Sequence, residues 1–134
     1  MSPAQVDGMR TLPTRHSVAD ALLRVKSLAL ARGLTVFAHI DFTADAERSG
    51  LVLRPTGLVI LGNPKAGTPL MAATPTVAID FPLKIVAWAD ADGQTWLAYN
   101  EPDYLQKRHG FARELMKNIA ALGSLAEAAA AQDS

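Results

Sequence analysis

Residues 83–99 read LKIVAWADADGQTWLAY, and this stretch decides the fold. Two runs of aliphatic and aromatic residues, 83–89 and 94–99, stand on either side of Asp90-Ala91-Asp92-Gly93. An Asp-Gly pair between two such runs is the turn signal of a β-hairpin. Trp88 and Trp96 can pair across the two strands, either in the core or along the wall of a pocket. The stretch therefore predicts two neighbouring antiparallel strands.

Three stretches upstream of the hairpin are also predicted to be strands. Residues 57–61 form a continuous apolar run bounded by turn residues, which is typical of a central strand. Residues 34–41 alternate between apolar and more polar side chains, which predicts a half-buried strand. Residues 9–15 form a shorter candidate, and Pro13 confines it to an edge of the sheet.

Two helices are predicted in the first half of the chain. Ser17 is a suitable N-cap for an amphipathic helix, and Gly33 fits the position just after its last turn. A shorter helix is predicted over residues 44–48, with Thr43 as its cap and Gly50 at its end.

The second half of the chain carries further helix signals. Thr68-Pro69 predicts the start of a helix of one or two turns. Residues 102–122 have an apolar stripe at helical spacing, and Gly110 is expected to kink or divide this region. Gly123-Ser124 predicts a break, followed by a new alanine-rich helix over residues 125–131 whose last turns fray.

Together these elements predict an α+β protein. We expect a single sheet of about four to five strands with helices packed on it, including a C-terminal β-hairpin followed by helices. A chain of 134 residues, of which 49% are hydrophobic, has the size and composition of one globular domain. We expect residues 1–8 to be a flexible N-terminal tail and residues 9–134 to form the single α+β domain.

Composition excludes several classes of function. Thirteen basic and thirteen acidic side chains cancel, so no overall field attracts nucleic acid or an anionic membrane. The absence of cysteine removes thiol catalysis, disulfides and thiolate metal sites. The N-terminal sequence has no signal-peptide pattern, and no apolar run approaches the ~20 residues of a membrane helix. We therefore expect a cytoplasmic protein that binds neither nucleic acid nor membrane.

Several short motifs, taken in order, resemble one family. Residues 58–64 read LVILGNP, residues 67–71 read GTPLM and residues 80–84 read DFPLK. These resemble the Gly-Asn-Pro, Gly-Thr-x-Leu-Met and Asp-Leu-Pro-Leu-Arg segments of the domain of unknown function 302 family, with Phe81 and Lys84 as conservative departures. The resemblance covers about residues 15–130 and implies an α+β fold. It also implies a homodimer, but no activity or catalytic residue. We expect the hairpin edge of the sheet to be the contact of that dimer.

Two sets of residues could form a site. His39 and Asp41 share a face of their strand and could share a proton or begin a metal site. Two ligands are too few for a metal, because neither His16 nor His109 has the spacing to supply a third, and we expect no metal. The bland alternative is that His39 lies on the polar face of the sheet and Asp41 caps the strand end.

The second set follows the predicted central strand. Residues 62–68 have the glycine spacing of a phosphate loop but lack the lysine that must follow the second glycine. A weaker hypothesis is that backbone N–H groups at the start of the Thr68 helix hold a small anion. The alternative is a turn whose glycine and proline residues set the backbone only.

Together, these two sets of residues lead to a hypothesis for one ligand site. If strands 34–41 and 57–61 were parallel, their polar ends would be neighbours; an antiparallel pair would separate them. The candidate ligand-binding residues are His39, Asp41, Asn63, Gly67, Thr68 and Lys84. We expect a small molecule or anion to bind in a cleft beside the sheet of a dimer, with no cofactor. Two alternatives stay open: an enzyme with His39 and Asp41 as general acid and base, and a protein-interaction module that uses the hairpin.

Overall fold

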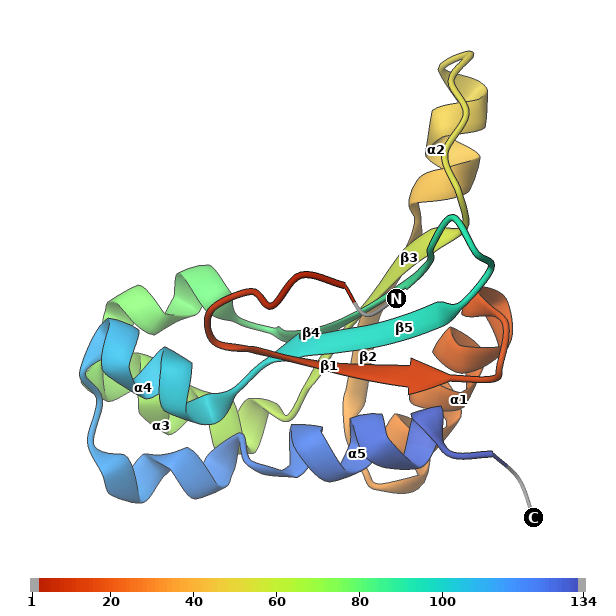
Figure 1. The fold of residues 1–134 in the computed structure, drawn as a ribbon. Helices are drawn as coiled ribbons and strands as arrows, with labels where there is room; N and C mark the ends of the chain where they lie inside the picture. The colour runs from red at the N-terminus through yellow and green to blue at the C-terminus, as the bar shows by residue number, and fades with distance from the viewer. Residues whose placement is uncertain (1–2, 133–134) are drawn as a thin grey trace.

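The computed structural model describes residues 3–132 and contains one antiparallel sheet with the strand order β1-β5-β4-β3-β2 (Figure 1). The α+β class and the five-stranded sheet are confirmed. The strands are β1 Met9–Thr14, β2 Thr35–Asp41, β3 Thr56–Gly62, β4 Leu83–Ala89 and β5 Thr95–Asn100. The helices are α1 Val18–Ala31, α2 Phe42–Arg48, α3 Pro64–Ala73, α4 Pro102–His109 and α5 Ala121–Ala130, with two 3₁₀ segments, η1 Pro75–Asp80 and η2 Arg113–Asn118.

The β4–β5 hairpin forms as expected, with Trp88 opposite Trp96. The indole N–H of Trp96 donates to the Asp90 carboxylate at 3.0 Å, which fixes the turn to the strand. In the sheet, however, β5 lies between β1 and β4, and β4 lies between β5 and β3. The expectation that the hairpin supplies an edge for dimer contact is therefore wrong, because β1 and β2 take the two edges.

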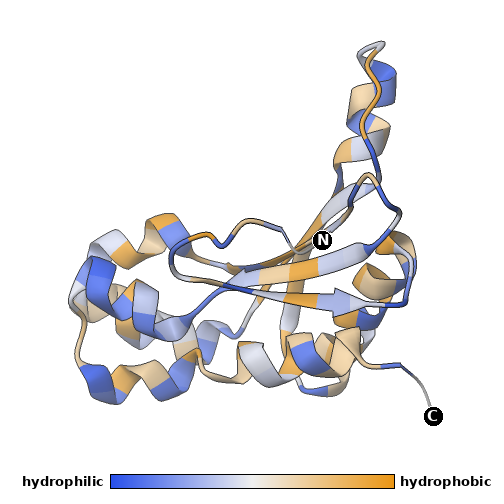
Figure 2. Cartoon of the chain, in the orientation of Figure 1, coloured by the Kyte–Doolittle hydropathy of each residue, from blue (hydrophilic) through white to orange (hydrophobic). Residues whose placement is uncertain are grey.

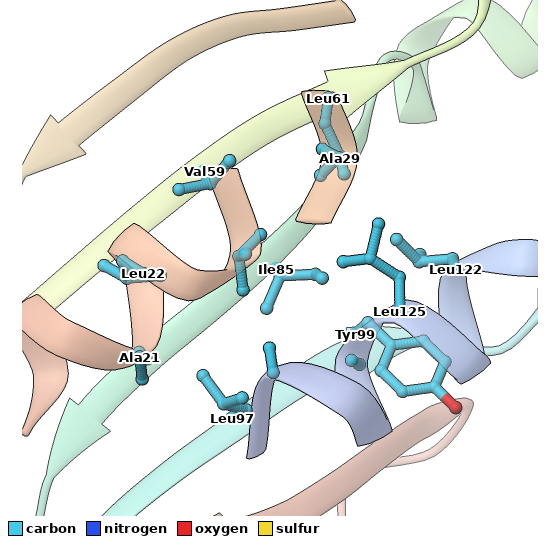
Figure 3. Packing of buried hydrophobic residues seen from close by; sticks show 14 of the residues in the cluster. Ala21, Leu22, Ala29, Val59, Leu61, Ile85, Leu97, Tyr99, Leu122 and Leu125 are labelled. Carbon is cyan, nitrogen blue, oxygen red and sulfur yellow. The ribbon is translucent and has the colours of Figure 1, made fainter. Parts of the chain in front are cut away.

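Helices α1 and α5 pack side by side on one face of the sheet and enclose the main core (Figures 1 and 3). Helix α1 begins at Ser17, whose hydroxyl accepts from the Asp20 N–H at 3.1 Å, and ends before Gly33, whose φ is +76°. Both helix signals predicted from the sequence are confirmed. The largest fully buried side chains of this core are Leu22, Val25, Val59, Leu61, Ile85, Leu97 and Leu125.

A second, smaller cluster lies at the end of the sheet where α3, η1, α4 and η2 gather. Its buried members are Leu70, Val77, Leu105, Phe111 and Ile119. Leu83, at the start of β4, packs against both clusters. This residue therefore joins the two apolar regions.

Strand β2 departs from the simple alternation that its sequence predicts. A β-bulge between Val36 and Ala38 shifts its register against β3. Val36 packs against the main core, whereas Ala38 lies opposite Ile60, whose side chain points to the other face. Because a one-residue irregularity exchanges the faces of everything after it, His39 falls on the same side as the core residue Val59.

Two helix boundaries differ from the prediction. Helix α3 begins at Pro64 with Asn63 as its N-cap, so Thr68 lies inside the helix. Helix α5 runs continuously through Gly123, where a break was expected. A Cβ at position 123 would lie 2.9 Å from the Tyr99 hydroxyl, so this glycine makes room for a packed tyrosine. The alanine-rich part of α5 also belongs to the core, since Ala126 and Ala129 are fully buried.

The described part of the expected N-terminal tail is attached to the domain. The carbonyl of Gly8 accepts from the Glu101 N–H at 2.7 Å, and the side-chain amide of Gln5 donates to Met9 at 2.8 Å. Residues 1 and 2 lie outside the described residues. Across residues 3–132, none of the helices combines the length and apolar character needed to cross a membrane.

Residues 42–55, comprising α2 and the extended segment after it, form an arm that projects from the ends of β2 and β3 (Figure 1). The cap of α2 is Asp41, whose carboxylate accepts from the Ala44 N–H at 3.0 Å. The predicted cap, Thr43, has another role: its hydroxyl donates to the Arg54 carbonyl and accepts from the Thr56 N–H. Thr43 thus ties the two sides of the arm together at its base.

Candidate functional site

An apolar pocket of about 320 Å³ opens at the end of the sheet beside α3. Its volume is at the lower end of the range of small-molecule sites. The end of β3, α3, η1, the start of β4 and η2 all contribute to its walls. The lining residues are Phe37, Gly62, Asn63, Pro64, Gly67, Thr68, Met71, Ala78, Phe81, Pro82, Leu83, Asn118 and Ile119.

The β2 bulge and two glycines shape this pocket. Phe37 is the residue at the bulge, and its ring reaches the pocket from the edge strand. A Cβ added to Gly62 would lie 3.7 Å from the Phe37 ring, and one added to Gly67 would lie 3.6 Å from the Phe81 ring. The two aromatic rings therefore approach the backbone at positions that have no side chain.

The chemistry of the pocket is almost entirely apolar. No ionisable side chain is among the described residues that line it. The Asn63 side-chain oxygen accepts from the Lys65 N–H at 3.0 Å, and the Asn118 amide donates to the Ala66 carbonyl at 3.0 Å, so both amides also hold α3. The Thr68 hydroxyl and the remaining capacity of these amides are the polar groups that a ligand would meet.

Three of the six candidate residues from the sequence meet here. Asn63, Gly67 and Thr68 line the pocket. The sequence signal that located them was the loop after the central strand. The apolar wall residues Phe37, Met71 and Phe81 were not identified as site residues. Nothing in a sequence distinguishes an isolated aromatic or methionine side chain that lines a pocket from one that lies in the core.

His39 and Asp41 do not join this pocket. Strands β2 and β3 are antiparallel, so Asp41 lies opposite Gly57, while Gly62 pairs with Thr35 at the other end of the ladder. Both side chains are largely exposed, and Asp41 caps α2. Burial against its neighbours lowers the pKa of His39 from the usual 6.5, the Lys26 ammonium lowers it further, and the Asp41 carboxylate raises it. Asp41 is therefore a helix cap, whereas His39 lies on the same side of the sheet as the core residue Val59 and not on the expected polar face.

Lys84 also lies apart from the pocket. Its ammonium donates to the Pro82 carbonyl at 2.9 Å and lies 3.4 Å from the Asp80 carbonyl.

The expected anion site at the N-terminus of a helix beginning at Thr68 is wrong, because the helix starts at Pro64 and the Gly67 N–H already donates to the Asn63 carbonyl at 2.8 Å. Interior helical N–H groups are satisfied within the helix and cannot hold an anion.

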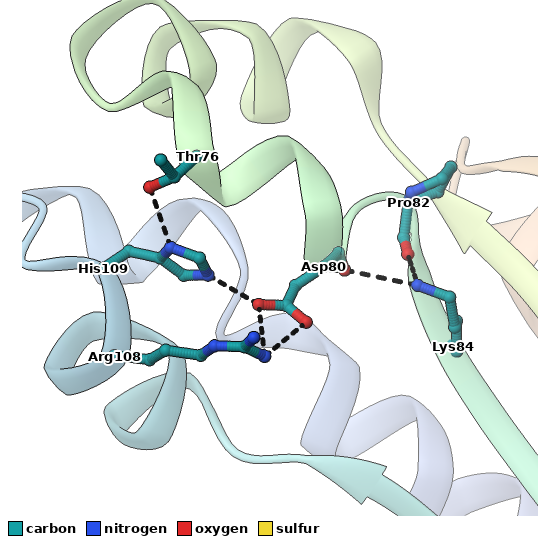
Figure 4. A network of polar contacts seen from close by, with 6 residues as sticks. All are labelled: Thr76, Asp80, Pro82, Lys84, Arg108 and His109. Atoms are coloured by element: carbon teal, nitrogen blue, oxygen red, sulfur yellow. Dashed lines mark hydrogen bonds and ion pairs between the residues drawn. The ribbon is translucent and has the colours of Figure 1, made fainter.

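A polar network fixes η1, which forms one wall of the pocket, to α4 (Figure 4). His109 Nε2 lies 2.5 Å from the Asp80 carboxylate, and Nδ1 lies 3.0 Å from the Thr76 hydroxyl. Arg108 contacts both Asp80 oxygens at 3.2 Å. The His109 side chain is 5% exposed, so the network is partly buried.

The sequence did not predict this network, because Arg108 and His109 of α4 are distant in sequence from Thr76 and Asp80 of η1. The available signal was Asp80 at the head of the Asp80-Phe81-Pro82-Leu83-Lys84 motif. Neither Thr76 nor His109 lines the apolar pocket. The contacts of His109 with Thr76 and Asp80 join α4 to η1. We therefore assign this network a positioning role. Within residues 3–132 there is no group of three or more histidine or acidic side chains arranged to hold a metal.

Comparison with known proteins shows which family this chain resembles in sequence and fold. Over 102 residues the chain is 43% identical to "Fluoride-specific ion channel FluC 1" of Brucella suis biovar 1 and, again over 102 residues, to "Fluoride-specific ion channel FluC 2" of Brucella melitensis biotype 1. The matched region is 76% of this chain but only 40% and 38% of those relatives, so the chain spans well under half of their length.

A solved structure shows the same fold. The crystal structure of a conserved DUF302 protein from Bacillus stearothermophilus superposes with a TM-score of 0.76 over 93% of this chain and 97% of the other, at 17% identity. The family model for the domain of unknown function DUF302 matches residues 10–129, which include nearly all of β1 and α5 and every strand and helix between them. The chain therefore belongs to the DUF302 family.

Proposed function

We propose that this chain is a cytoplasmic domain that binds a small, mostly apolar molecule in the pocket beside α3. The observation that carries the proposal is a cavity of about 320 Å³ whose walls include two phenylalanines, a methionine and a leucine. Burial of apolar ligand surface in such a cavity supplies roughly 25 cal/mol per Å². This geometry supports a non-catalytic binding function better than a reaction.

The pocket also favours one class of ligand over another. The lining residues within the described chain include no cation, so an inorganic anion would lose its hydration without a compensating charge. Thr68 and Asn63 offer neutral hydrogen-bonding groups at the side of α3. The best match is a neutral molecule with an apolar body and one polar group.

A second candidate function comes from the relatives with a channel name. Because 76% of this chain is 43% identical to part of a protein named as a fluoride-specific ion channel, a role as an accessory domain to fluoride transport is an alternative. That role would require either a response to fluoride or contact with a channel. The apolar pocket gives fluoride itself no cationic ligand, so we favour the neutral molecule.

The test is a titration followed through the Met71 methyl group by NMR. We use 1-naphthol as a neutral apolar probe, and inorganic phosphate and sodium fluoride as anionic probes. We expect saturable shifts of the Met71 methyl signal with 1-naphthol and none with either anion. Gly67→Leu should abolish the response, because its side chain projects toward Phe81 and Met71 and fills the cavity.

Ala72→Leu is the matched control, since it adds the same side chain at an exposed position of α3 outside the lining residues. It should leave the titration unchanged. A response to 1-naphthol that is equal in both variants would show that the probe binds elsewhere. A saturable shift of the same methyl signal with phosphate or fluoride would show that the pocket binds an anion, and would contradict the proposal of a neutral ligand.

A further inference from the structure

The arm formed by residues 42–55 carries hydrophobic residues (Figure 2), and four of their side chains are exposed to solvent. Val52 is 100% exposed, Leu51 is 65% exposed, and Leu53 and Phe42 are 42% and 37% exposed. Helix α2 has no buried residue among those described. Single exposed apolar residues are ordinary on a protein surface, but a cluster of four on one projection indicates an interaction site.

Local hydrogen bonds define the conformation of this arm. Asp41 caps α2, and the Leu51 N–H donates to the Ala46 carbonyl at 2.9 Å, which closes the helix and starts the return segment. Thr43 then joins that segment to the helix at the base of the arm. The chain therefore holds these apolar side chains in an ordered projection, away from its own core.

The sheet of the same chain also has an apolar surface, on the face that points away from α1 and α5. Because side chains alternate along strands, the residues between the core positions point away from α1 and α5. On β2, β3 and β4 this outward set is half-buried and mostly apolar, with Thr56 and Lys84 as its polar members: Ala38, Ile40, Thr56, Leu58, Ile60, Lys84, Val86 and Trp88. In Figure 1 the helical layer of α1 and α5 lies on one side of the described sheet and the arm points away from it.

We propose that the arm docks on the outward sheet face of a second copy of this chain, in a two-fold symmetric dimer. In such an interface the same two surfaces meet twice, so each copy contributes both the projection and the face that receives it. A standard interface uses roughly 20–30 residues per partner. The 14 residues of the arm and the residues of the outward face together reach the lower end of that range. This arrangement replaces the hairpin edge as the dimer contact and is independent of the ligand proposed for the pocket.

The first experiment measures the oligomeric state by sedimentation equilibrium. We expect the native chain to have twice the monomer mass of 14.3 kDa at micromolar concentration. Val52→Asp should shift the equilibrium to monomer, with at least a tenfold weaker association. Leu30→Asp is the matched control, because Leu30 is 64% exposed on α1 and lies on the opposite side of the sheet.

The second experiment identifies the surface that the arm contacts. Because the chain has no cysteine, Val52→Cys accepts a single nitroxide label. Mixed with ¹⁵N-labelled native chain, it should broaden the indole N–H signal of Trp88 on the other copy, whereas a label on Leu30→Cys should not. A native chain that is monomeric throughout, a Val52→Asp dimer of native strength, or equal broadening from both labels would each overturn the proposal.

Discussion

At the scale of single residues, the bulge at Phe37 has two consequences for the surface of the protein. It brings the Phe37 ring to the apolar pocket, and it turns the residues that follow to the opposite faces of β2. His39 therefore lies near α1: a Cβ at Gly57 would be 2.6 Å from Leu22 of α1 and 3.8 Å from His39 Nε2, so this glycine leaves room for Leu22.

This placement gives a pH prediction for His39. Its pKa in the folded protein is below 6.5, chiefly through burial and then through Lys26. The unfolded chain therefore binds more protons between the two values, so this contribution to stability is full above pH 6.5 and is lost as the pH falls through the folded pKa. Lys26→Met should raise the His39 pKa, and Asp41→Asn should lower it, in an NMR titration of the imidazole ring. Unchanged values in both variants would contradict this electrostatic account.

At the scale of elements, η1 depends on a polar network for its position. Asp80 receives His109 and Arg108 from α4, and Thr76 contacts the second nitrogen of the same imidazole. In the neutral ring, Nε2 donates to the carboxylate and Nδ1 accepts from the threonine hydroxyl. Removal of Asp80 would leave a buried donor without its acceptor.

We therefore expect Asp80→Ala to lower the free energy of unfolding by about 2 kcal/mol, because a buried hydrogen bond to a charged group is lost. Urea denaturation measures the change. The control is Asp45→Ala, which removes the partner of Arg48 in an exposed pair on the arm and should cost less than about 0.5 kcal/mol. Equal effects of the two substitutions would show that the Asp80 network does not stabilise η1.

The elements show which parts of the structure the sequence could predict. Signals that act within a few residues were sufficient for α1 and the hairpin, since Ser17, Gly33 and the Asp-Gly turn determine local backbone geometry. The signals failed where a distant contact decides the outcome. Gly123 was interpreted as a helix break, but it is a helical residue against Tyr99, which is distant in sequence.

The same distinction between local and distant contacts separates the candidate site residues that were predicted correctly from those that were not. Asn63, Gly67 and Thr68 are close in sequence and remained together in the pocket. His39 and Asp41 could be added only by assuming a parallel pair of strands, and the observed pair is antiparallel. Strand direction depends on the path of the whole chain, and no local pattern in residues 34–62 specifies it.

At the scale of the whole molecule, two apolar clusters form one cooperative unit. Leu83 packs against both clusters, and α1 and α5, from opposite ends of the sequence, share the larger one. We expect a single unfolding transition in calorimetry, because neither half of the chain can bury its apolar surface alone. Two well-separated peaks that do not move on dilution would contradict this expectation.

The pairing of β1 with β5 also has a consequence for synthesis of the protein on the ribosome. Met9 lies opposite Asn100, so β1 has no partner until β5, the last strand of this sheet, has been made. At translation rates of about 5–20 residues per second, the delay is on the order of ten seconds. Throughout that interval α5 has not been made, so the apolar side of α1 that α5 covers in the folded protein stays exposed.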